Sequence, residues 1–148
     1  MQDYTQVLET VRKLFVYPDE MNWKGMADEV FAENVLMDYS SFGAGEPITM
    51  KRDDIIAQWE PFFAKIDSTH HQLGNELVDI AEKEAKVSAY VMAGHYKEMQ
   101  NGDNLWTVVG TYNIKLFNGK NGWRVTEMKF NYKYQEGNQE IQKQGLEG

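Results

Sequence analysis

The sequence predicts an α+β fold in which three N-terminal helices pack into a strongly curved antiparallel sheet to form a cone-shaped barrel. Up to about residue 65, apolar residues recur mostly with the period of a helix, and from Ser68 onward the period changes to two. No internal repeat or linker interrupts the chain of 148 residues. We therefore expect a single domain over residues 1–136, followed by a polar tail over residues 137–148 that is frayed.

The helical part begins at residues 3–16, where apolar residues follow i, i+3, i+4, i+7 spacing up to the expected stop at Pro18. A shorter second helix is expected after Asp19, which lies in the elbow between the two helices, and either Asp19 or Asn22 is able to cap its first turn. A short strand is expected over residues 34–39, before a glycine-rich loop. Thr49 is then expected to cap a third helix with an apolar stripe made of Ile55, Ile56, Trp59, Phe62 and Phe63.

Four long segments with alternating polarity follow, each separated from the next by residues typical of turns. They cover residues 69–80, 85–99, 104–118 and 123–135. Because short turns join neighbouring strands, this pattern predicts an antiparallel meander. A sheet that curves around helices without filling the enclosed space leaves a cavity suited to a small molecule.

Composition excludes several classes of function. The chain has no cysteine, which rules out disulfides, thiol catalysis and thiolate metal sites. Its net charge of -8, with no cluster of basic residues, disfavours a nucleic-acid partner. Residues 1–17 lack the pattern of a signal peptide and no apolar run approaches the length of a membrane span, so we expect a cytoplasmic protein without a membrane partner.

Two of the three histidines, His70 and His71, are adjacent on the first long strand. Successive residues of a strand face opposite sides, and the more apolar neighbours of its own parity select His71 as the inward one. A carboxylate that orients an inward imidazole would make it a general base. The alternative is a core histidine that bonds a backbone carbonyl.

The other long strands supply further candidates for a pocket. His95 ends a run of small inward residues on the second strand, although it is also compatible with an edge position. We expect Thr111 and Asn113 to face inward on the third strand, because a pocket explains a polar amide there better than a core does. The inward residues of the fourth strand include Met128, Phe130 and Tyr132. The opposite parity carries an aromatic outer face that predicts an oligomer interface, with Tyr90, Met92, Tyr96, Trp106 and Tyr112.

A set of residues spread along nearly the whole chain points to a known family: Asp19, Trp23, the segment Asp38-Tyr39-Ser40-Ser41-Phe42, His71 with Leu73-Gly74, and Gly122-Trp123-Arg124. On these residues, the chain resembles the SnoaL-like group of the nuclear-transport-factor-2-like superfamily. Within the group it is most similar to the branch that contains scytalone dehydratase, the hexachlorocyclohexane dehydrochlorinase and the bile-acid dehydratases. These enzymes eliminate water or HCl from ring substrates.

The resemblance implies that His71 is the catalytic histidine, that Asp19 orients it, and that Tyr39 polarises a substrate carbonyl through a water. It matches His95 to a second catalytic histidine. It also implies a substrate-binding set of Trp23, Thr111, Asn113, Met128, Phe130 and Tyr132. A second water-holding tyrosine of scytalone dehydratase falls on Pro18, unless Tyr17 replaces it, and the tail lacks that enzyme's C-terminal phenylalanine. These departures argue against scytalone itself as the substrate.

Three functions remain open at this point. The first, which we favour, is a cofactor-independent lyase or isomerase acting on a small hydrophobic or ring-containing molecule, in which His71 removes a proton, Tyr39 stabilises the enolate and His95 protonates a leaving hydroxyl. The second is a non-catalytic module that binds a hydrophobic ligand. The third is a metal site on Asp19, His71 and His95, which lacks a compact ligand motif, so we predict no metal. We expect a homodimer, or a trimer as in the dehydrochlorinase branch.

Overall fold

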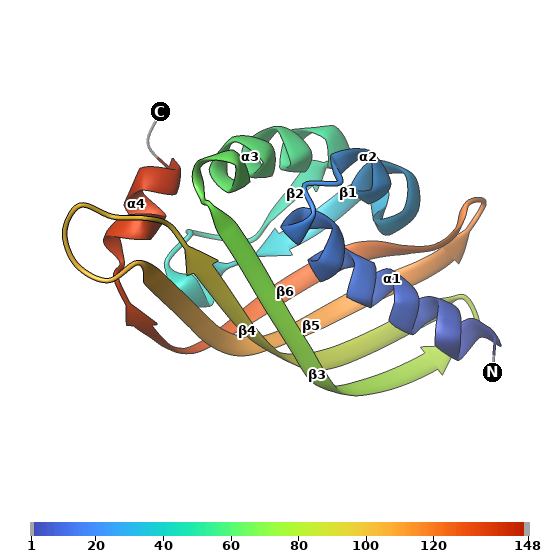
Figure 1. Ribbon diagram of the computed structural model, residues 1–148. Coiled ribbons are helices and arrows are strands. Elements are labelled where there is room, and N and C mark those ends of the chain that lie inside the picture. Colours follow the sequence, from blue (N-terminus) through green and yellow to red (C-terminus); the bar gives the residue numbers. More distant parts are fainter. Residues whose placement is uncertain (1, 147–148) are drawn as a thin grey trace.

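The computed structural model describes residues 2–146 and has helices packed on one face of a six-stranded mixed sheet (Figure 1). The α-helices are α1 (Gln2–Asp19), α2 (Trp23–Gly25), α3 (Arg52–Lys65) and α4 (Glu140–Leu146), with a π-helix η1 (Met26–Val30) and a 3₁₀ turn η2 (Ser40–Phe42). The strands are β1 (Phe31–Asp38), β2 (Ile48–Lys51), β3 (Ser68–Ala81), β4 (Glu84–Tyr96), β5 (Leu105–Gly119) and β6 (Gly122–Gly137). The predicted α+β class is confirmed.

The meander of four long strands is also confirmed, because β3, β4, β5 and β6 are consecutive antiparallel neighbours. The sheet continues beyond β6 through β1, which runs parallel to β6, and ends at β2. The sheet is therefore mixed rather than purely antiparallel. Thr49 does not cap a helix as predicted, because it lies in β2 and pairs with Leu36 of β1. The residue directly before α3 is Lys51.

Helix α1 lies along the inner face of the sheet and contacts β3 and β6 (Figure 1). Its buried stripe follows helical spacing and consists of Val7, Thr10, Val11, Leu14, Phe15 and Pro18. The helix continues through Pro18 to Asp19 instead of stopping at the proline. The amide N–H groups of Glu20 and Asn22 bond the carbonyl of Tyr17 and close this end of the helix. Asp19 is thereby held beside the first residues of β3.

In β3, the faces to which the side chains point match the prediction only up to a bulge. His71 and Leu73 point inward as expected, but the pairing with β4 shifts between Gly74 and Leu77. Asn75 has a φ of 50° there, a left-handed conformation that asparagine tolerates better than most residues. Beyond the bulge the parity reverses, so Leu77 is 73% exposed while Val78 turns toward the core.

Within the predicted frayed tail, residues 140–146 form helix α4, and residues 147–148 lie outside the described residues. The side chain of Asn138 accepts a hydrogen bond from the backbone N–H of Glu140 and caps the start of α4. Ile141, one of the few apolar residues in this polar stretch, is fully buried. Helix α4 packs against α3, and a Cβ at Gly145 would lie 2.5 Å from the Phe62 ring. The tail therefore forms part of the wall near α3.

Candidate active site

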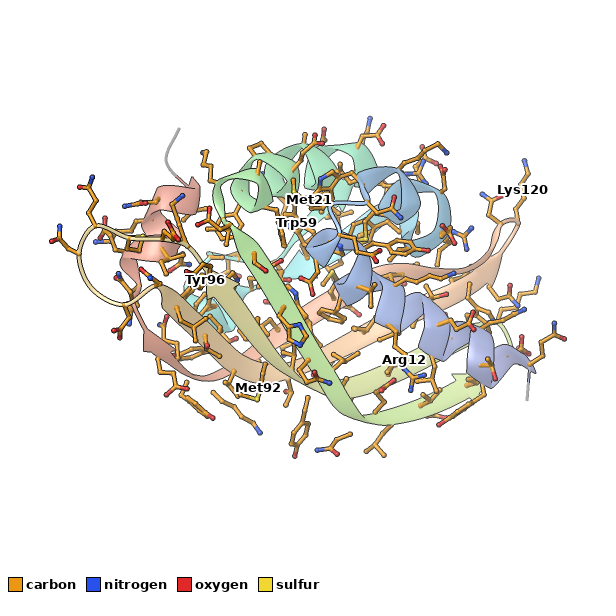
Figure 2. All side chains as sticks on the ribbon, in the orientation of Figure 1. Arg12, Met21, Trp59, Met92, Tyr96 and Lys120 are labelled. Carbon is orange, nitrogen blue, oxygen red and sulfur yellow. The ribbon has the colours of Figure 1, made fainter. Side chains whose placement is uncertain are left out.

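A cavity of about 650 Å³ lies between the helices and the inner face of the sheet. Its wall is mostly apolar and aromatic, with a small number of polar groups, as expected for a site that binds an organic molecule. The lining residues include Leu14, Phe15, Pro18, Tyr39, Trp59, Phe62, Phe63, His71, His95, Tyr112, Met128 and Leu146. Figure 2 labels Trp59, which comes from α3, and shows Met92 on the opposite face of the sheet.

The carboxylate of Asp19 accepts three hydrogen bonds from the start of β3. Its partners are the Thr69 hydroxyl at 2.8 Å, the His71 backbone N–H at 2.9 Å and the His71 ring nitrogen Nδ1 at 2.7 Å. The predicted contact between Asp19 and His71 is thus confirmed. Of the two predicted caps for the second helix, Asn22 is the one observed, because its side chain accepts from the Gly25 backbone N–H.

These contacts fix the tautomer of His71. Burial favours the neutral form of Asp19, but the hydrogen bonds from His71 and Thr69 outweigh that effect and hold the pKa of Asp19 below its usual value. An ionised carboxylate can only accept, so Nδ1 of His71 carries a proton, and in the neutral ring the lone pair is on Nε2. The His71 ring has two aromatic neighbours, Phe15 and Phe63, with ring centroids 5.7 and 6.4 Å away. These neighbours restrict the orientation of the ring.

Tyr39 and Tyr112 form the second polar pair of the cavity. Their hydroxyl oxygens lie 2.8 Å apart, so one hydroxyl donates to the other and the second keeps a hydrogen for a ligand. Burial raises the pKa of Tyr39 to about 12 and that of Tyr112 well above its usual value, which keeps both phenols protonated at neutral pH. The pair can therefore donate a hydrogen bond to a substrate oxygen.

His95 lies beside His71, with the centroids of the two imidazole rings 6.3 Å apart. It is 7% exposed and stacks on Trp106 at a centroid distance of 4.3 Å. Its Nδ1 donates to the carbonyl of Trp106 at 3.1 Å. Burial lowers the pKa of His95 to about 4, so its ring is neutral at pH 7.

Thr111 and Asn113 do not face the cavity, contrary to the prediction. Both lie on the outer face of the sheet, where the side-chain amide of Asn131 donates to Thr111 at 3.1 Å and to Asn113 at 2.7 Å. Trp106 and Tyr112, predicted to be outside, are buried on the inner face instead. The inner parity of β5 is the more apolar one, with Trp106, Val108, Tyr112, Ile114 and Leu116. That difference, weighed above the polarity of Asn113, was the signal that would have identified Tyr112.

Of the other predicted pocket residues, only Met128 lines the cavity. Phe130 packs behind the tyrosine pair, with centroids 5.9 Å from Tyr39 and 5.1 Å from Tyr112. Tyr132 packs on Phe42 at 5.1 Å. Trp23 is buried behind Phe63, with a centroid distance of 5.4 Å, and also lies outside the lining. These three aromatic residues therefore support the wall rather than form it.

Two further expectations concern Tyr17 and the helical walls. Tyr17 does not replace the tyrosine missing at Pro18, because its hydroxyl donates to the Glu29 carboxylate at 3.1 Å and Pro18 itself lines the cavity. Sequence reasoning placed Phe62 and Phe63 in a buried stripe without assigning them to the site. It also missed Phe15 on α1 and Leu146 on α4, since amphipathic patterns do not distinguish a cavity wall from a filled core.

The polar groups of the site do not form a metal centre. Within residues 2–146, no group of three histidine, aspartate or glutamate side chains is arranged to hold a metal ion. Both carboxylate oxygens of Asp19 already accept hydrogen bonds from β3.

Within residues 2–146, no helix is both long enough and apolar enough to cross a membrane.

Most of the chain matches a known protein family. The model of the SnoaL-like domain matches residues 1–129. The chain belongs to the SnoaL-like family. The resemblance predicted from Asp19, Tyr39 and His71 is thereby confirmed at the level of the family. No curated protein has a significantly similar sequence.

Several solved structures share the fold of this chain at low sequence identity. The Kfla4162 protein of Kribbella flavida superposes with a TM-score of 0.90 at 24% identity, covering 96% of this chain and 97% of that one. A protein of Novosphingobium aromaticivorans provisionally named a scytalone dehydratase has a TM-score of 0.75 at 17% identity, covering 90% and 85%. Hexachlorocyclohexane dehydrochlorinase LinA-type3 of Novosphingobium barchaimii has 0.71 at 10%, covering 90% and 88%. At these identities, the similarities establish the fold alone.

Proposed function

We propose that this protein is a lyase or isomerase that abstracts a proton next to a carbonyl group of a small, hydrophobic, ring-containing molecule. The observation that carries the proposal is the 2.7 Å hydrogen bond from His71 Nδ1 to an Asp19 carboxylate that is itself held by β3. A carboxylate in this position selects the tautomer with a basic Nε2 and stabilises the imidazolium that forms when Nε2 takes a proton.

The proposed reaction needs a base that removes the α-proton and a hydrogen-bond donor at the carbonyl oxygen. Nε2 of His71 takes the proton, and the electron pair of the C–H bond moves to form an enolate. The free hydroxyl hydrogen of the Tyr39–Tyr112 pair is directed to the enolate oxygen, in the manner of an oxyanion hole. The imidazolium then returns its proton to another carbon of a conjugated enolate, which moves the double bond and gives isomerisation. In elimination, the enolate electrons re-form the carbonyl and make a C=C bond as the bond from carbon to the leaving group breaks, and the imidazolium protonates the departing group. This sequence requires no cofactor.

The nature of the cavity supports the substrate class. Its walls are dominated by aromatic and aliphatic side chains such as Phe15, Phe62 and Met128, which suit an apolar ring system. Two relatives by fold carry names for elimination reactions, dehydration and dehydrochlorination, which likewise remove a proton from a carbon atom. The dyad, the tyrosine pair and the apolar walls are together best suited to enolate chemistry.

Deuterium exchange tests the proposal before the natural substrate is known. Cyclic ketones such as 2-tetralone and cyclohexenones are incubated with the protein in D₂O, and loss of the α-proton signals is followed by NMR. We expect exchange above the buffer rate with at least one ketone, and loss of that exchange in His71→Gln. His70→Gln is the matched control, because His70 is exposed on the other face of β3. Ketone binding with no exchange above buffer would favour a non-catalytic binding module.

A further inference from the structure

We propose that His95 is a specificity residue that accepts a hydrogen bond from a hydroxyl or N–H group of the substrate. The site would therefore select ring compounds that carry such a donor in addition to the carbonyl. This inference rests on the proposed function only in calling the bound molecule a substrate. The selection itself concerns binding and does not require catalysis. It replaces the role predicted from the sequence, in which His95 protonates a leaving hydroxyl.

The tautomer of His95 follows from its partner. A carbonyl oxygen can only accept a hydrogen bond, so the contact of Nδ1 with the Trp106 carbonyl at 3.1 Å places the ring proton on Nδ1. A neutral imidazole has a single N–H, which leaves Nε2 as an acceptor. Within residues 2–146, the hydrogen bonds of the His95 ring run to the backbone of Trp106 and, more weakly, of Ala93, whose carbonyl groups accept and do not donate. His95 lines the cavity, where a ligand can supply the donor.

The surroundings of His95 oppose a second proton on its ring. Trp106 stacks on one side at 4.3 Å, and Phe62 approaches edge-on at 6.3 Å, so a charged ring would lose hydration without gaining a counter-ion in contact. The titratable groups that influence it are His71, which lowers the pKa of His95, and Asp19, whose opposing effect is smaller. Asp19 already accepts three hydrogen bonds. His95 therefore remains neutral while His71 takes up and releases a proton.

The polar groups of the cavity then define a pattern for the ligand. Nε2 of His71 and Nε2 of His95 are acceptors, and the Tyr39–Tyr112 pair offers a donor. A ring ketone with no hydroxyl or N–H would bury the His95 nitrogen without a partner. Leaving a buried acceptor unpaired weakens affinity roughly 5- to 150-fold. Compounds with a donor are favoured by that factor.

The acceptor role also limits the chemistry. A hydroxyl that donates to His95 gains electron density, which disfavours its departure as a leaving group. The substrate hydroxyl at His95 is therefore retained, and the proton that His71 removes from carbon is the one that His71 has available to return. The C–H bond breaks and the N–H bond forms on Nε2 of His71. The same proton is then delivered to another carbon, or to a separate leaving group as its bond to carbon breaks and a C=C bond forms.

A matched pair of probes tests the selection. 2-Naphthol carries a hydroxyl donor, and 2-methoxynaphthalene has the same ring without one. By isothermal titration calorimetry, we expect 2-naphthol to bind the wild type roughly 5- to 150-fold more tightly. In His95→Phe, the affinity for 2-methoxynaphthalene should be retained and the ratio should fall to about one. In His71→Phe, the preference should persist. Equal binding of the two probes by the wild type, or loss of the preference only in His71→Phe, would overturn the proposal.

Nitrogen NMR of protein labelled with ¹⁵N-histidine tests the same proposal without altering His95. The expected spectrum at pH 7 has a protonated Nδ1 and an unprotonated Nε2 for His95, and 2-naphthol shifts that Nε2 signal. His70→Gln and His71→Gln assign the other ring signals. A charged His95 ring, or a proton on its Nε2, would contradict the assignment. The outcome is independent of ketone exchange, so selective binding without exchange would refute the proposed catalysis and leave the specificity role intact.

Discussion

The carboxylate of Asp19 and the imidazole of His71 lie 2.7 Å apart although 52 positions separate them in the chain. Asp19 is the last residue of α1 and His71 lies near the start of β3, so their contact depends on α1 lying against that strand. The same carboxylate also bonds the Thr69 hydroxyl and the His71 backbone N–H. One side chain thus orients the ring and links the helix to the sheet.

Replacing this carboxylate should therefore alter the tautomer of His71. In Asp19→Asn, the new amide group can donate to Nδ1 of His71 and stabilise the tautomer in which Nε2 carries the proton and is no longer basic. We expect the rate of ketone α-proton exchange to fall by roughly 10²- to 10⁴-fold. Far-ultraviolet circular dichroism should remain native. The neighbouring exposed Glu20→Gln is the control, and an equal loss of activity in that variant would remove the special role of Asp19.

The tyrosine pair gives a second prediction about catalysis. Tyr39→Phe and Tyr112→Phe should each slow exchange by an amount corresponding to about 3 kcal/mol, the cost typical of losing one oxyanion donor. Tyr112 contributes because its hydroxyl lies 2.8 Å from that of Tyr39, so either removal disrupts the pair. Steady-state rates with the exchanging ketone provide the measurement. Tyr132→Phe, outside the cavity lining, should exchange at the wild-type rate.

Stability should depend on pH through His95. Its folded pKa of about 4 lies below the usual value, so between pH 6.5 and 4 the unfolded chain binds more protons than the folded protein. The contribution of His95 to the free energy of unfolding should decrease over this range as pH falls, by a total of the order of 3 kcal/mol. Urea unfolding at several pH values measures the slope. His95→Gln should have a shallower slope, whereas an unchanged slope would mean that His95 titrates normally.

Asp19 affects stability in a lower pH window. Its folded pKa is depressed, so its contribution is fully present above the pKa of the unfolded chain and is lost as pH falls through the folded value. Asp19→Asn should therefore lose less stability than the wild type on acidification below about pH 4. The comparison uses the same urea titrations, and parallel curves for the two proteins in that window would argue against a depressed pKa.

The outer face of the sheet predicts association. Tyr90, Met92 and Tyr96 on β4 are 52%, 48% and 41% exposed, which is a large apolar area for a solvated strand. We expect a homodimer, or a trimer, that covers this face. Sedimentation velocity at micromolar concentration should detect it, and Met92→Glu should shift the distribution toward the monomer. A monomeric wild type would mean that these side chains have another role.

The sequence was sufficient for α1, the four long strands and the contact between Asp19 and His71, but not for every element or orientation. Regular periodicity identified α1 and the four long strands, and the family resemblance paired Asp19 with His71. The bulge at Asn75 reverses the parity of β3, which no count of alternating residues can anticipate. The parallel pairing of β1 with β6 joins segments far apart in the chain, and local patterns carry no information about it.

Errors at the site had a different origin. On β5, both parities contain polar and apolar residues, and the amide of Asn113 was given more weight than the larger apolar set that includes Tyr112. Asn113 needs no pocket because Asn131 on β6 satisfies it at 2.7 Å. Helix α4 was missed because its burial depends mainly on one residue, Ile141. In each case a contact across the fold outweighed the local pattern.

Chemical rescue tests the central claim, that Nε2 of His71 is the proton-abstracting base, most directly. His71→Ala removes the ring beside Asp19 and leaves space next to Phe15 and Phe63. Its ketone α-proton exchange in D₂O is measured by NMR with and without added imidazole, beside the exposed control His70→Ala. We predict that exchange is lost in His71→Ala, recovers in part with imidazole, and is unchanged in His70→Ala. Exchange by His71→Ala at the wild-type rate without imidazole would contradict the claim.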